Sequence, residues 1–104
     1  MDRKDHVPMV ELLQPVEFEW DEWNIRKNRL KHRTLSDEIE QAFTDPQKKI
    51  FADVLHSKKE DRYIGIGKTN KDRILYIVFT IRNKKRVRVI SARDLNRKER
   101  SLYP

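Results

Sequence analysis

The run Arg73–Ile81, RILYIVFTI, constrains the fold of this 104-residue chain more than any other stretch. It is the most apolar run in a sequence that is 37% hydrophobic and 39% charged. Its β-branched and aromatic residues favour a strand, and a continuous apolar strand is buried on both faces. We therefore expect it at the centre of a sheet, inside one domain with a small core.

Four shorter segments of strand character surround this run. Short turns at 69–72 and 82–85 connect the last three strands, which predicts an antiparallel meander. Gly65 and Gly67 fall on one face of the preceding strand and leave it bare, so a helix or a ligand backbone can come close. The four segments are Val16–Trp20 (VEFEW), Lys49–Val54 (KIFADV), Arg62–Lys68 (RYIGIGK) and Arg86–Ser91 (RVRVIS).

The segment 21–33 is predicted to be a helix. Asp21 is its expected N-cap, and its acids come first and its bases last, as the helix dipole favours. Its apolar stripe is thin, since only Trp23 and Leu30 lie seven residues apart with Trp20 leading in.

A second helix is predicted over 35–43, LSDEIEQAF, with Thr34 as its cap. Leu35, Ile39, Ala42 and Phe43 recur at i, i+4, i+7 and i+8, which is a core-facing stripe. A third helix is expected in the terminal segment 92–103.

These elements predict an α+β fold in the order β-α-α-β-β-β-β-α. An antiparallel sheet would carry the two N-terminal helices on one face and a short C-terminal helix. Residues 1–15 sustain no period, and we expect an N-terminal arm there, followed by a single domain over 16–104.

The net charge is concentrated in one segment. Arg82–Arg100 holds nine Lys and Arg against two acids, so it carries +7, the net charge of the whole chain. A localised positive field attracts a polyanion, which indicates a nucleic-acid partner. The alternative is a solvated basic face, which is common in so charged a chain.

Several classes of protein are disfavoured. The chain has no Cys, so it has no disulfide and no thiolate zinc site. It has neither a membrane-length apolar run nor an apolar segment near its first residues. Metal-binding and nucleophile-elbow motifs are absent, and GIGK lacks the third glycine of a dinucleotide fingerprint. We expect a soluble cytoplasmic protein without a metal or cofactor.

Candidate chemistry gathers in the segment HSKKEDR. His56 or Glu60 could act as a general base or acid beside Arg62, a phosphate-binding cation. Metal-free RNA cleavage needs only a group that takes the 2′-OH proton, a group that protonates the leaving oxygen and cations for the phosphorane. A solvated charged loop with a Glu60–Arg62 pair is the alternative, and His32 could serve only as a helix-terminal cation.

A series of motifs follows in a fixed order over residues 16–103, and the ordered set resembles the BrnT toxin family. The motifs are FEWD (Phe18–Asp21), N-x-x-K-H (Asn28, Lys31, His32), F-x-D-P (Phe43, Asp45, Pro46), H-S-x-x-E-x-R-Y (His56, Ser57, Glu60, Arg62, Tyr63), V-F-T-x-R (Val78–Arg82), R-V-I-S-A-R (Arg88–Arg93) and R-x-E-R-x-x-Y (Arg97, Glu99, Arg100, Tyr103).

The resemblance implies a ribonuclease toxin of a bacterial type II toxin–antitoxin module, with a fold similar to that of the RelE ribonucleases. It implies a BrnA-like antitoxin in a hetero-oligomer, contact with DNA only through that antitoxin, and RNA as substrate. Ile81 stands where the family often has an acid, and Asp94-Leu95 replace its usual small residues.

We therefore expect a metal-independent endoribonuclease that inhibits translation and growth. Arg62 and Arg88 would be its phosphate and transition-state cations, and Glu60 or His56 its proton acceptor. The RNA-binding residues would be Lys31, His32, Arg82 and Arg93. The alternatives are a non-catalytic nucleic-acid-binding or regulatory subunit, and a structural basic protein.

Overall fold

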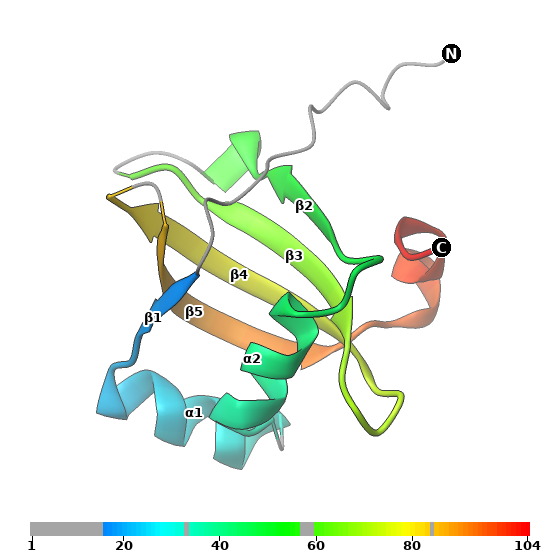
Figure 1. Cartoon of the computed structure of the whole chain (residues 1–104), viewed down its shortest axis with the longest axis horizontal. Coiled ribbons are helices and arrows are strands. Elements are labelled where there is room, and N and C mark those ends of the chain that lie inside the picture. The colour runs from blue at the N-terminus through cyan, green and yellow to red at the C-terminus, as the bar shows by residue number, and fades with distance from the viewer. Residues whose placement is uncertain (1–15, 33, 57–59, 84) are drawn as a thin grey trace.

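The computed structural model describes residues 16–32, 34–56, 60–83 and 85–104, except the side chains of Lys31, His32 and His56. The predicted N-terminal arm, 1–15, lies outside the described residues. Figure 1 shows two helices packed against a twisted five-stranded sheet. The elements are β1 (Glu17–Glu19), α1 (Glu22–His32), α2 (Ser36–Phe43), β2 (Lys49–Ala52), β3 (Tyr63–Lys68), β4 (Ile74–Arg82) and β5 (Arg86–Asp94), with 3-10 turns at Val54–His56 and Arg97–Leu102.

The sheet has the strand order β1-β5-β4-β3-β2 and is mixed. Strands β2 to β5 form an antiparallel meander with β4 inside it, as its apolar run predicts. β1 pairs with β5 in parallel, with Phe18 opposite Val87. The prediction of a purely antiparallel sheet was therefore wrong at this edge. Alternation along VEFEW identifies a strand and its two faces, but it carries no information on strand direction.

α2 covers one face of the sheet, as its stripe predicts. Ile39, Ala42 and Phe43 are buried, and the Phe43 ring meets the ring of Phe79 edge-on at 5.1 Å between centroids. A Cβ on Gly67 would stand 2.3 Å from the Ala42 carbonyl oxygen, so α2 lies where only glycine leaves room. The prediction that the bare glycine face admits a helix is confirmed.

The start of α2 differs from the prediction by one position. Leu35, and not Thr34, is the N-cap residue, and its backbone N–H donates to the Glu38 carboxylate at 3.1 Å. Thr34 is instead buried, and the Arg73 guanidinium donates to its hydroxyl at 3.2 Å. A predicted cap is thus used for a tertiary contact.

α1 lies along β5 and turns polar residues toward it. Asn24 Nδ2 donates to the Val89 carbonyl at 3.2 Å, and Asn28 Oδ1 accepts from the Ala92 N–H at 3.1 Å. β1 pairs with β5 only as far as Arg88, and the two bonds from α1 are made to β5 residues beyond that point. The helix therefore satisfies an edge that would otherwise be open to another strand. The thin stripe of Trp23 and Leu30 faces solvent instead of the sheet.

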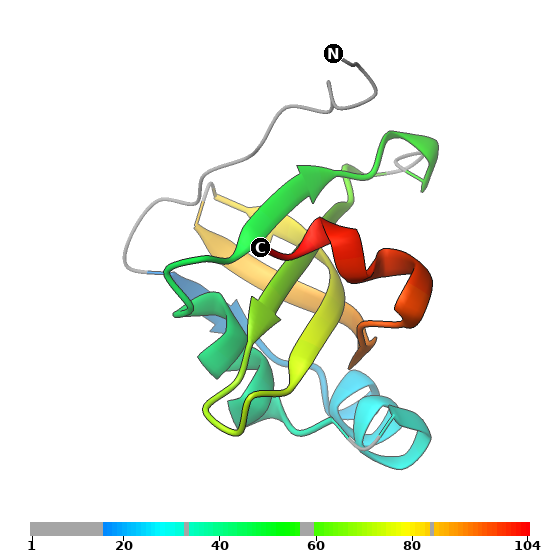
Figure 2. The same cartoon turned by 90° about the vertical axis from the view of Figure 1, so that its right-hand side faces the viewer.

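The C-terminal segment is the end of β5 followed by a 3-10 helix, Arg97–Leu102. The predicted short C-terminal helix is therefore present, but it is a 3-10 helix and it begins at Arg97 instead of Ala92. Residues 92–94 continue β5. Asn96 and Glu99 then form a capping box at the turn Arg97–Leu102. Tyr103 anchors the end, because its hydroxyl donates to Asp45 at 2.5 Å. Figure 2 shows this segment in front of the strands, separate from α1.

Within the described residues, no helix is long and apolar enough to cross a membrane.

Candidate functional site

The sheet face away from α2 carries alternating polar side chains of β4 and β5. Phe79 and Val89 are paired and buried in the core. Their neighbours Thr80 and Arg88 therefore lie on the opposite face of the sheet. On that face Arg88 lies opposite Thr80, and Arg86 lies opposite Arg82. The alternation of RVRVIS thus places its arginines on the face that α2 leaves uncovered.

Two of these arginines converge on one carboxylate oxygen. Glu19 Oε2 lies 3.6 Å from Arg82 Nη1 and 4.0 Å from Arg88 Nε. Arg82 also reaches Glu60, with 3.8 Å between its Nη2 and the carboxylate Oε1. We call Glu19, Glu60, Arg82 and Arg88 the arginine cluster. It joins β1, β4, β5 and the segment before β3.

Asp21 fixes the position of Arg88 from the helix side. Its Oδ2 lies 3.2 Å from Arg88 Nη2, while its Oδ1 accepts the backbone N–H of Trp23 at 2.7 Å. The hydrogen bond from the Trp23 N–H, followed by those from Asn24 and Arg88, holds the pKa of Asp21 below its usual value despite the opposing effect of desolvation. The predicted N-cap is confirmed, and it is tied to the cluster.

The remaining charges of β1 continue the same pairing. Glu17 lies 3.4 Å from Lys85 Nζ and 3.7 Å from Arg86 Nε. Acids at i and i+2 of β1 therefore face bases at i and i+2 of β5, in the register that the parallel pairing sets. Part of the positive charge of the C-terminal segment is neutralised here.

Arg93, a predicted RNA-binding residue, has a separate setting. It forms a two-pronged ion pair with Glu99 at 2.8 and 2.7 Å, and its guanidinium lies 4.1 Å from the centre of the Tyr76 ring. The bond from Arg93 lowers the pKa of Glu99. Both contacts fix the C-terminal turn on the sheet, so the structure gives Arg93 a structural role that sequence reasoning did not foresee.

The other predicted site residues are only partly placed. Arg62 is half-buried just before β3, and its carbonyl accepts the Asp53 N–H at 2.8 Å. His56 ends the 3-10 turn Val54–His56, and Lys31 and His32 end α1, but the side chains of these three lie outside the described part. The structure thus joins Glu60, Arg82 and Arg88, and leaves Arg93 in its own ion pair.

The sequence did not identify Glu19 and Asp21 as partners of the site arginines. The signal was present, because the acids of VEFEW and the bases of RVRVIS share a two-residue spacing. Using that signal required knowledge that the two strands are neighbours, which spacing alone does not supply.

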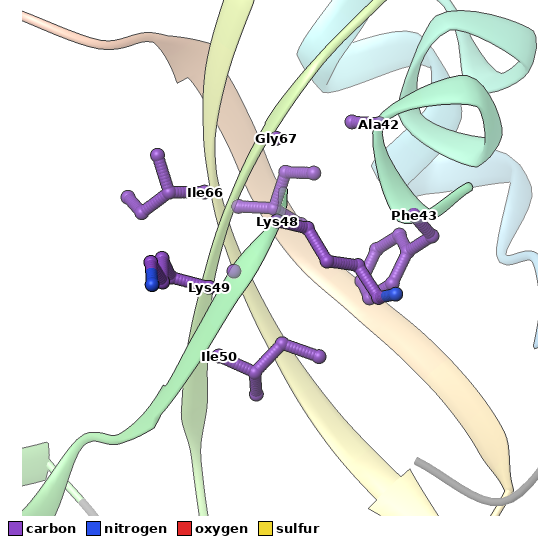
Figure 3. A pocket seen from close by; sticks show the side chains of 9 residues that line it. Ala42, Phe43, Lys48, Lys49, Ile50, Ile66 and Gly67 are labelled. Carbon is purple, nitrogen blue, oxygen red and sulfur yellow. The ribbon is translucent and has the colours of Figure 1, made fainter. Parts of the chain in front are cut away.

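A depression between α2 and strands β2 and β3 is a second candidate site. Figure 3 shows its lining side chains, which are apolar except for two lysines whose amino groups point to different sides. It has no acidic side chain in its wall and its two lysines do not converge, so we assign it to packing. Its lining residues are Ala42, Phe43, Lys48, Lys49, Ile50, Gly65, Ile66, Gly67 and Ile77.

Across residues 16–32, 34–56, 60–83 and 85–104, no group of three or more His, Asp or Glu side chains is arranged to hold a metal ion.

A search of curated proteins finds no match to this chain. The family model described as "Ribonuclease toxin, BrnT, of type II toxin-antitoxin system" matches residues 20–99, which include α1, the whole meander and Arg82 and Arg88. The match spans most of the 104 residues. The chain therefore belongs to the BrnT family of ribonuclease toxins of type II toxin–antitoxin systems.

Proposed function

We propose that this toxin is a metal-independent endoribonuclease that works at the arginine cluster. The observation that carries the proposal is the convergence of Arg82 and Arg88 on a single oxygen of Glu19. Guanidinium groups bind phosphate and carboxylate oxygens in the same geometry, so this oxygen marks where a phosphate oxygen could sit. The cluster lies on the sheet face away from α2, where the side chains of Arg82 and Arg88 are partly exposed and would contact an RNA strand.

The reaction begins with the RNA itself. A 2′-oxygen bonds to the adjacent phosphorus while its proton passes to a base, and the bond from phosphorus to the 5′-oxygen breaks as that oxygen takes up a proton. The products are a 2′,3′-cyclic phosphate and a 5′-hydroxyl. Charge develops on the phosphorane oxygens, and Arg88 with Arg62 would stabilise it.

Glu60 is one candidate proton acceptor, because its carboxylate is part of the arginine cluster and lies 3.8 Å from Arg82 Nη2. His56, four residues before Glu60 in the sequence, is the alternative acceptor. Lys31, His32, Arg82 and Arg93 would bind the RNA on either side. For Arg93 this means that RNA competes with Glu99 for its guanidinium.

A second candidate function is a non-catalytic nucleic-acid-binding or regulatory subunit. The observation that favours it is that Glu60, Arg82 and Arg88 all take part in ion pairs within the chain. A binder needs no proton acceptor and tolerates such pairing. The two functions differ in their response to Glu60→Gln and His56→Ala, which a binder tolerates and a nuclease does not.

The direct test is incubation of the purified chain with end-labelled RNA in excess EDTA, followed by analysis of fragment ends. Cyclic phosphate ends would support metal-free 2′-OH attack. Arg88→Ala should lower the cleavage rate by about 10²- to 10³-fold. Arg97→Ala is the matched control, because it removes the same charge from an exposed position on the C-terminal 3-10 turn. Tight, salt-sensitive binding without cleavage, on free RNA and on translating ribosomes, would contradict the nuclease proposal.

In the cell we propose a cytoplasmic toxin that arrests translation and growth until a BrnA-like antitoxin binds it. The complex would contact DNA only through the antitoxin. We further propose that residues 16–104 form one RelE-like toxin domain and that 1–15 act as an arm. Growth arrest on expression of the toxin alone, relieved by co-expression of the antitoxin, tests the role. Arrest by Arg88→Ala at the wild-type level would contradict the site.

A further inference from the structure

α1 has the reverse of the usual amphipathic arrangement. Its polar Asn28 is fully buried against β5, while Trp23 and Leu30 are 70% and 76% exposed. These two residues lie seven positions apart, so they belong to one stripe about 10 Å long on the solvent side of the helix. Large apolar side chains gathered on an outer helix face mark a surface that binds another molecule.

The surroundings of the stripe are basic. A shallow depression beside it is lined by Glu22, Ile25, Arg26, Arg29 and Leu30. The sequence of α1, EWNIRKNRLKH, contains four Lys and Arg against one acid. The stripe thus offers two apolar contacts inside a positive field, which is complementary to a segment carrying apolar residues among acids.

This surface is also well placed on the molecule. Figures 1 and 2 both show α1 at one end, with the sheet and α2 on its inner side. The backbone N–H of Trp23 bonds to Asp21, and Asp21 in turn bonds to Arg88 of the arginine cluster. The backbone of Trp23 is therefore linked to Arg88 through the single side chain of Asp21.

We propose that the outer face of α1, defined by Trp23, Arg26 and Leu30, is a docking surface for the antitoxin, which binds it through an acidic amphipathic segment. The inference deepens the proposed function by assigning the partner a place on the toxin. A protein partner is favoured over RNA because the centre of the surface is aliphatic as well as aromatic, and exposed tryptophan and leucine in a charged rim are typical of protein interfaces. Seated there, the segment reaches the cluster and can block RNA from it.

The test uses the full-length toxin and the antitoxin of the same module, with affinity measured by calorimetry or biolayer interferometry. Trp23→Ala should weaken binding at least about 30-fold, as expected for a central interface tryptophan, and Leu30→Ala by a smaller factor. Leu55→Ala is the matched control, because Leu55 is 81% exposed on the 3-10 turn after β2. It should leave the affinity within about twofold. Reversal of charge in Arg26→Glu should slow association, most at low salt.

The outcome is independent of the nuclease proposal. RNA cleavage is measured on the same variants without antitoxin, and Trp23→Ala and Leu30→Ala should cleave as wild type does. If the nuclease proposal is wrong, no variant will cleave RNA and neither will the wild type. The antitoxin affinities would still test the docking surface in that case. Antitoxin affinity within threefold of wild type for the Trp23→Ala, Leu30→Ala double variant would overturn the docking surface. So would a Trp23-dependent dimer of the toxin alone in sedimentation, or a Trp23-dependent loss of RNA affinity.

Discussion

Asp21 Oδ2 lies 3.2 Å from Arg88 Nη2, so the residue that caps α1 also holds an arginine of the proposed site. One carboxylate thereby couples the start of a helix to the uncovered face of the sheet. Any change at Asp21 acts on both.

The stability of the fold should respond to acid through Asp21. Its pKa is lowered in the folded protein, first by the hydrogen bond from the Trp23 N–H. A lowered pKa gives stability that is present above the ordinary value of 3.8 and is lost as pH falls through the folded value. Urea unfolding from pH 6 down to about pH 2.5 should show a steeper loss for wild type than for Asp21→Asn, which keeps the cap oxygen but not the charge. Parallel curves would show that the charge of Asp21 adds nothing.

Neutralising Glu19 should tighten RNA binding. Its carboxylate occupies the space between Arg82 and Arg88, where a phosphate would have to compete with it. Glu19→Gln should strengthen binding of a non-cleavable 2′-deoxy oligonucleotide by about two- to fivefold at low salt, the size expected for an exposed ion pair. The gain should shrink as salt is added.

The control for that measurement is Asp37→Asn, which removes one negative charge from an exposed position in the first turn of α2. It should change the RNA affinity less than Glu19→Gln does. Equal gains from both would mean that net charge alone governs binding, and weaker binding by Glu19→Gln would place Glu19 among the residues that organise the site.

The buried Asn28 should be more important to stability than its neighbour one turn earlier. Asn28→Ala leaves the buried Ala92 N–H without its acceptor, which costs about 1–3 kcal/mol in the free energy of unfolding. Asn24→Ala removes a hydrogen bond that is only partly buried, and it should cost about 0.5–1.5 kcal/mol. Urea midpoints of the two variants measure the difference, and a larger loss in Asn24→Ala would contradict the edge-capping role of α1.

The two glycines of β3 should also differ. A Cβ on Gly67 would meet the Ala42 carbonyl oxygen at 2.3 Å, whereas one on Gly65 would meet the Phe79 ring at 3.2 Å. Backbone cannot give way as a ring edge can, so Gly67→Ala should lose about 3 kcal/mol or more and Gly65→Ala about 1 kcal/mol. Thermal unfolding ranks them, and Gly67→Ala as stable as wild type would show that α2 shifts freely.

Local patterns predicted those parts of the fold that local contacts decide. The stripe of α2 and the bare face of β3 meet in the structure because each follows from spacing within one element, Ala42 on Gly67. The direction of β1 could not be predicted, because it depends on which distant strand offers an edge. The inward side of α1 could not be predicted for a related reason, because Asn24 and Asn28 face inward only where the edge of β5 offers them backbone partners.

The candidate site shows the same division. Arg82 and Arg88 were predicted from charge and resemblance, and the structure brings them together. Glu19 was missed because its role depends on the register of β1 against β5. Arg93 looked like its basic neighbours in sequence, yet the capping box at Asn96 brings Glu99 back onto it.

The C-terminal anchor should make the protein sensitive to alkali. Burial, and then the hydrogen bond to Asp45, raise the pKa of Tyr103 to about 12 from an ordinary 10.0. A raised pKa gives stability that is complete below pH 10 and is lost as pH rises toward 12. Tyr103→Phe removes a hydrogen bond to a charged group and should cost about 1.5–3 kcal/mol at neutral pH. Denaturant unfolding from pH 7 to about pH 11.5 should show wild type losing its advantage over Tyr103→Phe as the phenol ionises. A constant difference between the two proteins across that range would mean that the Tyr103 hydroxyl does not bond to Asp45 in solution.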